Sequence, residues 1–272
     1  MQDREFYIVK EEPLEILRKC RRHSKGTLFG FLAGICLLYL FMNWVPEILG
    51  IFIPQTNIDL LMHFENASVN KEMLEKLPGT PLVMLIYAFL LNGAFRLGEC
   101  FYTLTYIRNK KVDCRAIFEG FAIYGKVFGL FLLQTIIIGF WAMFLIIPGI
   151  MAAVNFSQSF YILADDPSKG ITQVLAESKL RMLGTRMTYL RVLIAFLPYY
   201  FAAYLPAMAV SYFVPADTFS TPVYTAIMMA VEIPIFAAYG MIDLGRCTFY
   251  ELLINRGFEN FRYAGQDAFR ED

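Results

Sequence analysis

Ionised side chains that interrupt apolar runs are the residues of this chain best placed to do chemistry. Arg96 and Glu99 stand three residues apart inside the run 81–107, and Glu232 stands two residues before a proline in a later run. Charges are costly in hydrocarbon, so they usually pair with one another or line a path for an ion or solute. Arg96 and Glu99 share one helical face and can pair. The sequence leaves a structural ion pair and a transport path both open.

A second group consists of uncharged polar residues in another apolar stretch. Asn155, Gln158 and Ser159 follow i, i+3, i+4 spacing, so a continuous helix would place them on one face. Polar groups in lipid cost free energy unless they are satisfied, so we expect this face to point into a helical bundle. Hydrogen bonding between helices and a polar cavity for a ligand both fit the pattern.

Patterns typical of known enzymes are missing. The histidines, His23 and His63, fall on opposite sides of the expected membrane, so they cannot build one metal site or one catalytic triad. The sequence has no GxSxG, HExxH or phosphate-loop motif. Its five cysteines are scattered without a CxxC pair, which predicts reduced thiols. We therefore expect no catalytic residues, no metal, no cofactor and no enzymatic activity.

The elements that must position these residues are long apolar helices. The chain is 57% hydrophobic and 18% charged, with a mean hydropathy of +0.49, whereas soluble domains carry about 25% charged residues. A helix needs about 20 apolar residues to cross the hydrocarbon core. We predict an all-α, polytopic membrane helical bundle of six transmembrane helices within 27–254. The expected spans are 27–53, 81–107, 127–147, 150–164, 188–214 and 222–254.

Segments outside the spans are polar. We expect a basic cytoplasmic segment at 1–26, an outer loop at 54–80, and a loose polar tail at 255–272. Of the 24 Lys and Arg residues, only Lys71 and Lys76 fall in an outer loop and Arg96 falls in mid-span. The positive-inside rule then predicts cytoplasmic N- and C-termini. A formal net charge of zero gives no reason to expect a nucleic-acid partner.

The centre of the chain predicts a membrane hairpin followed by a helix on the membrane surface. Pro148 and Gly149 are expected to make the hairpin turn at the far membrane face. Asp166 is the expected N-cap, and Pro167 the first residue, of an amphipathic cytoplasmic helix over 167–186. Its apolar stripe fits either the membrane interface or packing against the protein's own bundle. The stripe comprises Ile171, Val174, Leu175, Ser178 and Met182.

Three short stretches carry a resemblance to a known family. They are 145–150 (LIIPGI), 161–167 (YILADDP) and 177–184, with weaker matches at 92–98 and 249–253. Over 92–255 the chain resembles a large family of uncharacterised bacterial integral membrane proteins. That family is related to the membrane domain of some glycerophosphodiester phosphodiesterases. The resemblance implies a bacterial cytoplasmic (inner) membrane protein of this topology, and it supplies no catalytic residues.

Two functions are compatible with these observations. The first is a non-enzymatic membrane component that binds or organises partner proteins or lipids, in envelope assembly, stress or peptide immunity. Its partners would be membrane lipids, another membrane protein or a second copy of the chain, and its docking element would be the helix at 169–184. The alternative is a transporter or channel for a small or amphipathic solute. Its path would be lined by Arg96, Glu99, Asn155, Gln158, Ser159 and Glu232.

Overall fold

The computed structural model describes residues 27–52, 82–109, 111–214 and 221–267. The expected all-α membrane architecture is confirmed, because these residues form eight α-helices and one 3-10 helix and contain no strand. The segments 1–26 and 54–80 lie outside the described residues. The final helix does not end at the predicted start of the tail, since α10 continues from Thr221 to Asp267.

Five helical stretches among the described residues are long and apolar enough to cross a membrane. The remaining expected span, 81–107, corresponds to α4 (Leu82–Asn109), a helix of 28 residues. It carries Arg96 and Glu99 and is not one of these five. The described part of each expected span is therefore mainly helical, with a turn at 156–158 that interrupts the fourth. The five stretches are Leu28–Val45, Tyr124–Phe144, Ile146–Asp165, Arg186–Phe213 and Ala226–Ile254.

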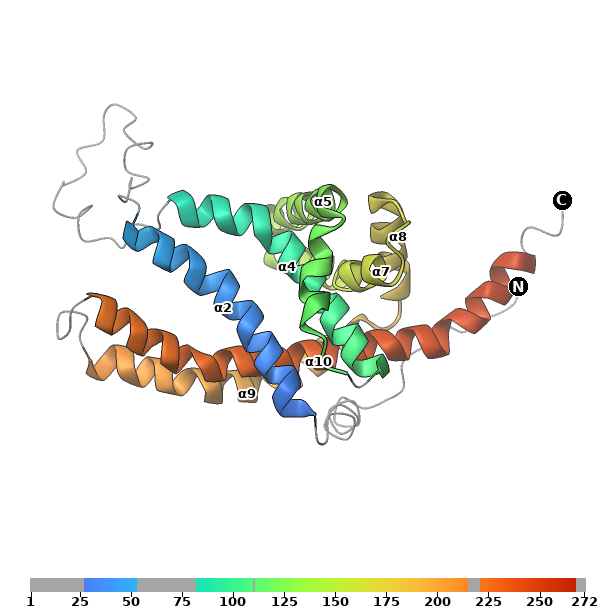
Figure 1. Cartoon of the computed structure of the whole chain (residues 1–272). Coiled ribbons are helices and arrows are strands. Elements are labelled where there is room, and N and C mark those ends of the chain that lie inside the picture. The colour runs from blue at the N-terminus through green and yellow to red at the C-terminus, as the bar shows by residue number, and fades with distance from the viewer. Residues whose placement is uncertain (1–26, 53–81, 110, 215–220, 268–272) are drawn as a thin grey trace, which may run out of the picture.

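Two helical hairpins point in different directions (Figure 1). Helices α9 (Arg186–Phe213) and α10 lie side by side in the plane of the view, whereas α5 (Tyr124–Phe144) is seen almost end-on above them. Helix α6 (Ile146–Asn155) returns against α5. Helices α2 (Leu28–Phe52) and α4 run obliquely in the same view, and both contact α10. The spans are thus not six parallel rods.

The turn of the α5–α6 hairpin lies at Leu145, so the prediction that Pro148 and Gly149 form it is wrong. Leu145 alone leaves the helical region, with φ −157° and ψ 143°. Pro148 falls in the first turn of α6, where a missing amide hydrogen costs no helical bond. Gly149 lies against α5, and a Cβ there would stand 2.8 Å from the Cα of Ala142. The two residues allow the hairpin arms to pack closely rather than reverse the chain.

The surface helix begins later than predicted. Asp166 and Pro167 do not open it, because α7 (Ser159–Asp165) ends there and the Asp166 side chain closes a turn by accepting from the Ser168 amide at 3.1 Å. Helix α8 (Ile171–Arg181) is instead capped at Gly170, whose amide donates to the Gln173 side chain at 3.0 Å. After α8, Gly184 adopts a left-handed φ of 83°. A glycine accepts that conformation at little cost, as expected for the end of this helix.

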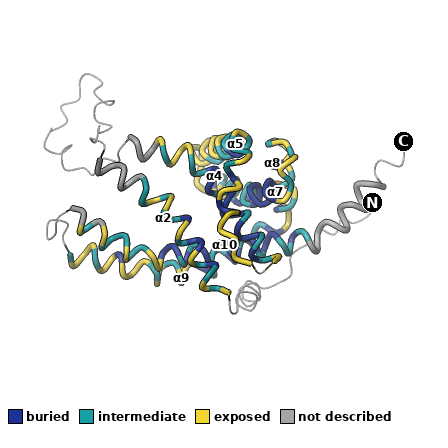
Figure 2. Tube along the Cα trace, viewed as in Figure 1, coloured by how far each residue is buried: buried dark blue, intermediate teal, exposed yellow. Residues whose placement is uncertain are grey.

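The apolar stripe of α8 faces the protein rather than lipid. Val174 and Ser178 are fully buried, and Leu175 and Met182 are buried with them. The stripe therefore packs against the bundle, which was one of the two arrangements open from the sequence. Figure 2 shows this buried zone where α4, α7, α8 and α10 meet.

The stretch after α4 is a packed element as well as a basic loop. The 3-10 helix η2 (Cys114–Phe121) lies against α4, with Ala116, Ile117 and Gly120 buried. The contact is backbone to backbone. A Cβ at Gly98 of α4 would lie 1.9 Å from the Ile117 carbonyl oxygen, and one at Gly120 would lie 2.2 Å from the Ala94 oxygen. Two glycines thus permit the close approach that holds η2 in place.

Candidate functional site

The structure joins the two intramembrane ion pairs into one cluster between α4 and α10. Arg96 Nη1 contacts Glu99 within α4 and also reaches Asp243 Oδ1 of α10 at 3.3 Å. Arg246 Nη1 lies 3.0 Å from the same Asp243 oxygen. Glu99 and Asp243 are 3% and 1% exposed. The cluster therefore holds two acids and two bases, and its formal charges cancel.

Tyrosine and threonine hydroxyls complete this cluster. The Tyr39 hydroxyl of α2 donates to Glu99 Oε1 at 2.9 Å, and the Tyr161 hydroxyl of α7 donates to the Asp243 backbone oxygen at 3.4 Å. Thr103 Oγ1 donates to the Glu99 backbone oxygen at 2.7 Å. The sequence prediction did not include Tyr39. The feature that could have identified Tyr39 is its phenol inside an apolar span, because a buried phenol needs a hydrogen-bond partner.

Glu232 is separate from the cluster. It lies eleven residues before Asp243 on α10, which corresponds to about 16 Å along a helix. The Trp44 indole of α2 points its Nε1 at Glu232 Oε2 across 3.5 Å. Because Glu232 and Arg96 have different partners, the structure does not assemble the proposed path residues into one group.

The polar face of the return arm is divided by a break in the helix. Residues 156–158 form a turn between α6 and α7, so Asn155 and Ser159 do not sit on one continuous helix as predicted. Ser159 Oγ donates to Gln134 Oε1 of α5 at 2.9 Å, and Ser178 of α8 donates to the Asn155 backbone oxygen at 2.7 Å. Gln158 is fully buried. These contacts are the interhelical hydrogen bonds that the sequence offered as one of two interpretations.

Two amide oxygens in this break lack a partner. Asn155 Oδ1 and Gln158 Oε1 are buried without a hydrogen bond to any described residue. Gln158 Nε2 donates to Ser157 Oγ at 3.0 Å, so half of that amide is satisfied. A buried acceptor without a donor costs free energy, so each of these two oxygens lowers the stability of the packing at this break.

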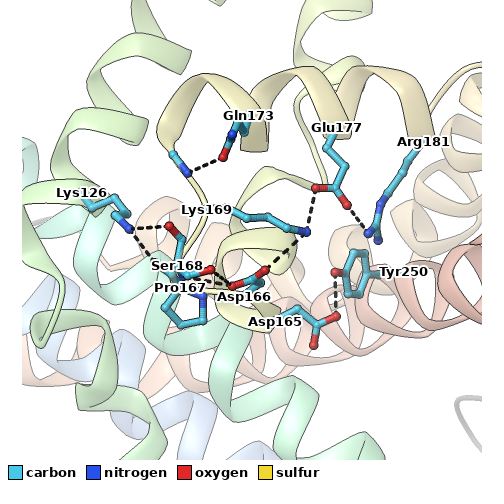
Figure 3. A network of polar contacts seen from close by, with 11 residues as sticks. Lys126, Asp165, Asp166, Pro167, Ser168, Lys169, Gln173, Glu177, Arg181 and Tyr250 are labelled. Atoms are coloured by element: carbon cyan, nitrogen blue, oxygen red, sulfur yellow. Dashed lines mark hydrogen bonds and ion pairs between the residues drawn. The ribbon is translucent and has the colours of Figure 1, made fainter. Parts of the chain in front are cut away.

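A third network lies on the side of the protein that is predicted to be cytoplasmic (Figure 3). Lys126 Nζ at the start of α5 donates to the Pro167 carbonyl oxygen at 2.6 Å. Lys169 Nζ lies 2.8 Å from Glu177 Oε2, and Glu177 also pairs with Arg181. The Arg181 guanidinium stands 5.5 Å from the centre of the Tyr250 ring. These contacts fasten α8 to the base of the hairpin and to α10.

Arg108 ties three helices together at the same level. Its Nη1 lies 2.6 Å from Asp165 Oδ1 of α7, and its Nε lies 2.8 Å from Glu251 Oε1 of α10. The Tyr250 hydroxyl donates to the other Asp165 oxygen at 3.0 Å. A planar guanidinium suits this two-way contact, because its donors point in fixed, divergent directions.

We expect Arg108→Lys to lower stability by about 1 kcal/mol, because a single ammonium cannot hold both carboxylates in this geometry. The value is small because the Arg108 side chain is 42% exposed and water screens the pairs. Thermal unfolding of the purified protein in detergent measures the effect. Arg191→Lys, on an exposed position of α9, is the matched control and should leave the unfolding temperature unchanged.

Hydrogen bonds from the Ser168 hydroxyl and backbone amide lower the pKa of the Asp166 carboxyl below its usual value. A carboxyl whose pKa is depressed in the folded state stabilises that state above its unfolded pKa. This contribution is lost as the pH falls through the lowered pKa. The turn between α7 and α8 is therefore stable at neutral pH and weakens only in acid.

The described ranges contain no group of three or more His, Cys, Asp or Glu side chains placed to hold a metal ion. Comparison with protein-family models, with curated proteins and with solved structures finds no match for this chain. The resemblance to uncharacterised bacterial membrane proteins therefore remains a prediction.

Proposed function

We propose that this chain is a non-enzymatic membrane protein that binds anionic lipid headgroups, and through them organises its surroundings, at its cytoplasmic face. The observation that carries the proposal is an exposed surface at the junction of α8 and α9. We call it the α8–α9 surface, and it comprises Lys179, Leu180, Leu183, Met187 and Arg191.

The α8–α9 surface combines exposed cations with exposed apolar side chains. Leu180 and Met187 are 54% and 62% exposed. Lys179 and Arg191 are exposed beside them, while the neighbouring acid Glu177 already pairs with Lys169. Apolar side chains that dip below the headgroups, flanked by cations that meet the phosphates, favour an anionic lipid surface.

The transport alternative receives less support from the same structure. Arg96 forms ion pairs with both Glu99 and Asp243. The Ser159 hydroxyl donates a hydrogen bond to Gln134. A path for a solute would need these groups to exchange protein partners for solute. Their mutual neutralisation instead favours a structural role in the bundle.

A bacterial cytoplasmic-membrane location with both termini inside belongs to the same proposal. The lopsided Lys and Arg distribution supports the orientation, and the resemblance described above supports the bacterial setting. The α8–α9 surface would then face the cytoplasmic leaflet, whose anionic lipids attract basic residues near the membrane.

The test compares lipid retention by the wild-type chain and by the double variant Lys179→Gln/Arg191→Gln. Each protein is reconstituted with equal amounts of phosphatidylglycerol and phosphatidylcholine and purified in mild detergent, and its bound lipid is counted by mass spectrometry. At about 1 kcal/mol for each cation, the variant should prefer phosphatidylglycerol at least tenfold less.

The matched control is Lys111→Gln/Arg115→Gln, which removes the same charge from two exposed positions, one just before η2 and one in its first turn. This control should keep the wild-type preference. Equal retention by the α8–α9 variant and the wild-type chain would overturn the proposal. A preference that both variants lose equally would mean that net charge, rather than this surface, selects the lipid.

A further inference from the structure

We propose that the α5–α6 hairpin enters and leaves the membrane from the cytoplasmic side without crossing it. Lipid acyl chains would cover its apolar outer half, which would end within the hydrocarbon and no deeper than about the middle of the bilayer. This inference does not depend on the lipid-binding proposal, since it rests on how the hairpin is anchored to α8.

Helix α8 fixes the level of the hairpin's base. The segment 169–181 carries Lys169, Glu177, Lys179 and Arg181, and charged groups at this density belong in water or among headgroups. Ser178 of α8 donates to the Asn155 backbone oxygen at 2.7 Å. The last residue of α6 therefore lies at the level of the charged helix rather than in mid-membrane.

The return arm is too short to cross from that level. Helix α6 has 10 residues, which rise about 15 Å, or half of a hydrocarbon core of about 30 Å. The turn at Leu145 is thus only half a membrane away from Asn155. No further residues lengthen the return arm at the turn, because α6 begins directly after the turn residue Leu145.

The outgoing arm is anchored at the same level. Lys126 donates to the Pro167 carbonyl oxygen, and a Cβ at Gly129 would stand 2.8 Å from Ile171 Cδ1 at the start of α8. Further along α5, Gln134 Oε1 accepts a hydrogen bond from the Ser159 hydroxyl at 2.9 Å. Only ten residues separate Gln134 from the end of α5, which again gives about 15 Å. The part of α5 beyond its contact with Ser159 therefore matches α6 in length.

The composition of the outer half fits hydrocarbon and not water. From Ile136 to Val154 the only polar side-chain atom is the indole nitrogen of Trp141. The residues around the turn are strongly exposed, with Met143 at 87% and Ile146 at 76%. A turn that emerged into water would be expected to carry polar residues, as the sequence 215–221 (PADTFST) does between α9 and α10.

The hairpin is strongly inclined to the long helix pair, so its turn lies no deeper than the length of its arms allows. In Figure 1, α5 points along the line of sight while the long pair α9 and α10 lies across it. Both pairs cannot stand along one membrane normal. We assign the crossings to α2, α4, α9 and α10, and this even number keeps both termini on one side.

Depth-dependent fluorescence quenching tests the proposal. The variant Phe144→Trp is made in a Trp44→Phe/Trp141→Phe background, so that its single tryptophan lies beside the turn. It is reconstituted in vesicles of phosphatidylcholine brominated either near the chain ends or near the carbonyls. We expect several-fold stronger quenching by bromines near the chain ends. Stronger quenching by the shallow bromines would place the turn at an interface and overturn the proposal.

A labelling experiment provides an independent measurement. Leu145→Cys in a cysteine-free chain should react with a membrane-impermeant maleimide from neither side. Lys179→Cys should react from the cytoplasmic side and Asp217→Cys, in the predicted outer turn, from the other. Labelling of Leu145→Cys from either side contradicts the proposal.

Absence of quenching at every depth would show that a second copy or another protein covers the turn, which would also overturn the lipid contact. If Phe144→Trp fails to fold, Ile147→Trp on the opposite arm repeats the measurement, since Ile147 is 75% exposed and its side chain is not needed by the core.

Discussion

Replacing Arg96 with methionine should lower the free energy of unfolding by about 3–5 kcal/mol, the loss typical of breaking a buried ion pair from one side. The substitution removes the guanidinium that both Glu99 and Asp243 contact. Glu99 is then left almost fully buried with the Tyr39 hydroxyl as its remaining described side-chain donor. Unfolding in mixed micelles of a mild detergent and dodecyl sulfate measures the change.

Two further variants separate the buried charge from general damage. Arg191→Met removes an exposed arginine of α9 and should be nearly neutral. Adding Glu99→Gln to Arg96→Met removes the stranded acid, so the double variant should be more stable than Arg96→Met alone. If the double variant lost the full sum of the two single losses, the ion pair would not be the source of the effect.

The second large effect is expected at the contact between α4 and η2. Gly98→Ala places a methyl group where the Ile117 carbonyl oxygen now lies, at 1.9 Å from the ideal Cβ position. Neither partner is a flexible side chain, so backbone has to move. We expect a loss of about 3 kcal/mol, at the upper end of the usual range for overpacking. Thermal unfolding in detergent measures this loss.

Gly139→Ala is the matched control for this prediction. Gly139 lies in α5 with nothing within 4 Å of the ideal Cβ position, so the same methyl group meets no obstacle. Because alanine favours helix over glycine, this variant should equal or slightly exceed the wild-type stability. Equal losses from Gly98→Ala and Gly139→Ala would show that the η2 contact is not tight.

Local rules predicted the helices and the i, i+3 ion pairs, because these depend on hydropathy and on spacing along one helix. They could not show that Arg96 meets Asp243, since that contact joins residues 147 positions apart and depends on how α4 packs on α10. They also missed η2, whose placement follows from the matching glycines Gly98 and Gly120 rather than from its own pattern.

The wrong predictions share one cause, which is that local signals were ambiguous. A proline followed by glycine suits a turn, yet Pro148 is equally acceptable in the first turn of a helix. Asp166 and Gly170 are both suitable helix caps, and the choice was decided by α7 continuing to Asp165. The polar spacing of Asn155, Gln158 and Ser159 assumed an unbroken helix, which the turn at 156–158 interrupts.

Helix α10 extends well beyond its apolar stretch. It is continuous from Thr221 to Asp267, with its one internal proline at Pro234, deep within the apolar part. Beyond Ile254, the end of its apolar stretch, thirteen more residues extend the rod by about 20 Å. Any tilt of the buried part, such as one imposed by a change in bilayer thickness, is therefore carried outward to Asp267 as a proportionally larger sideways displacement.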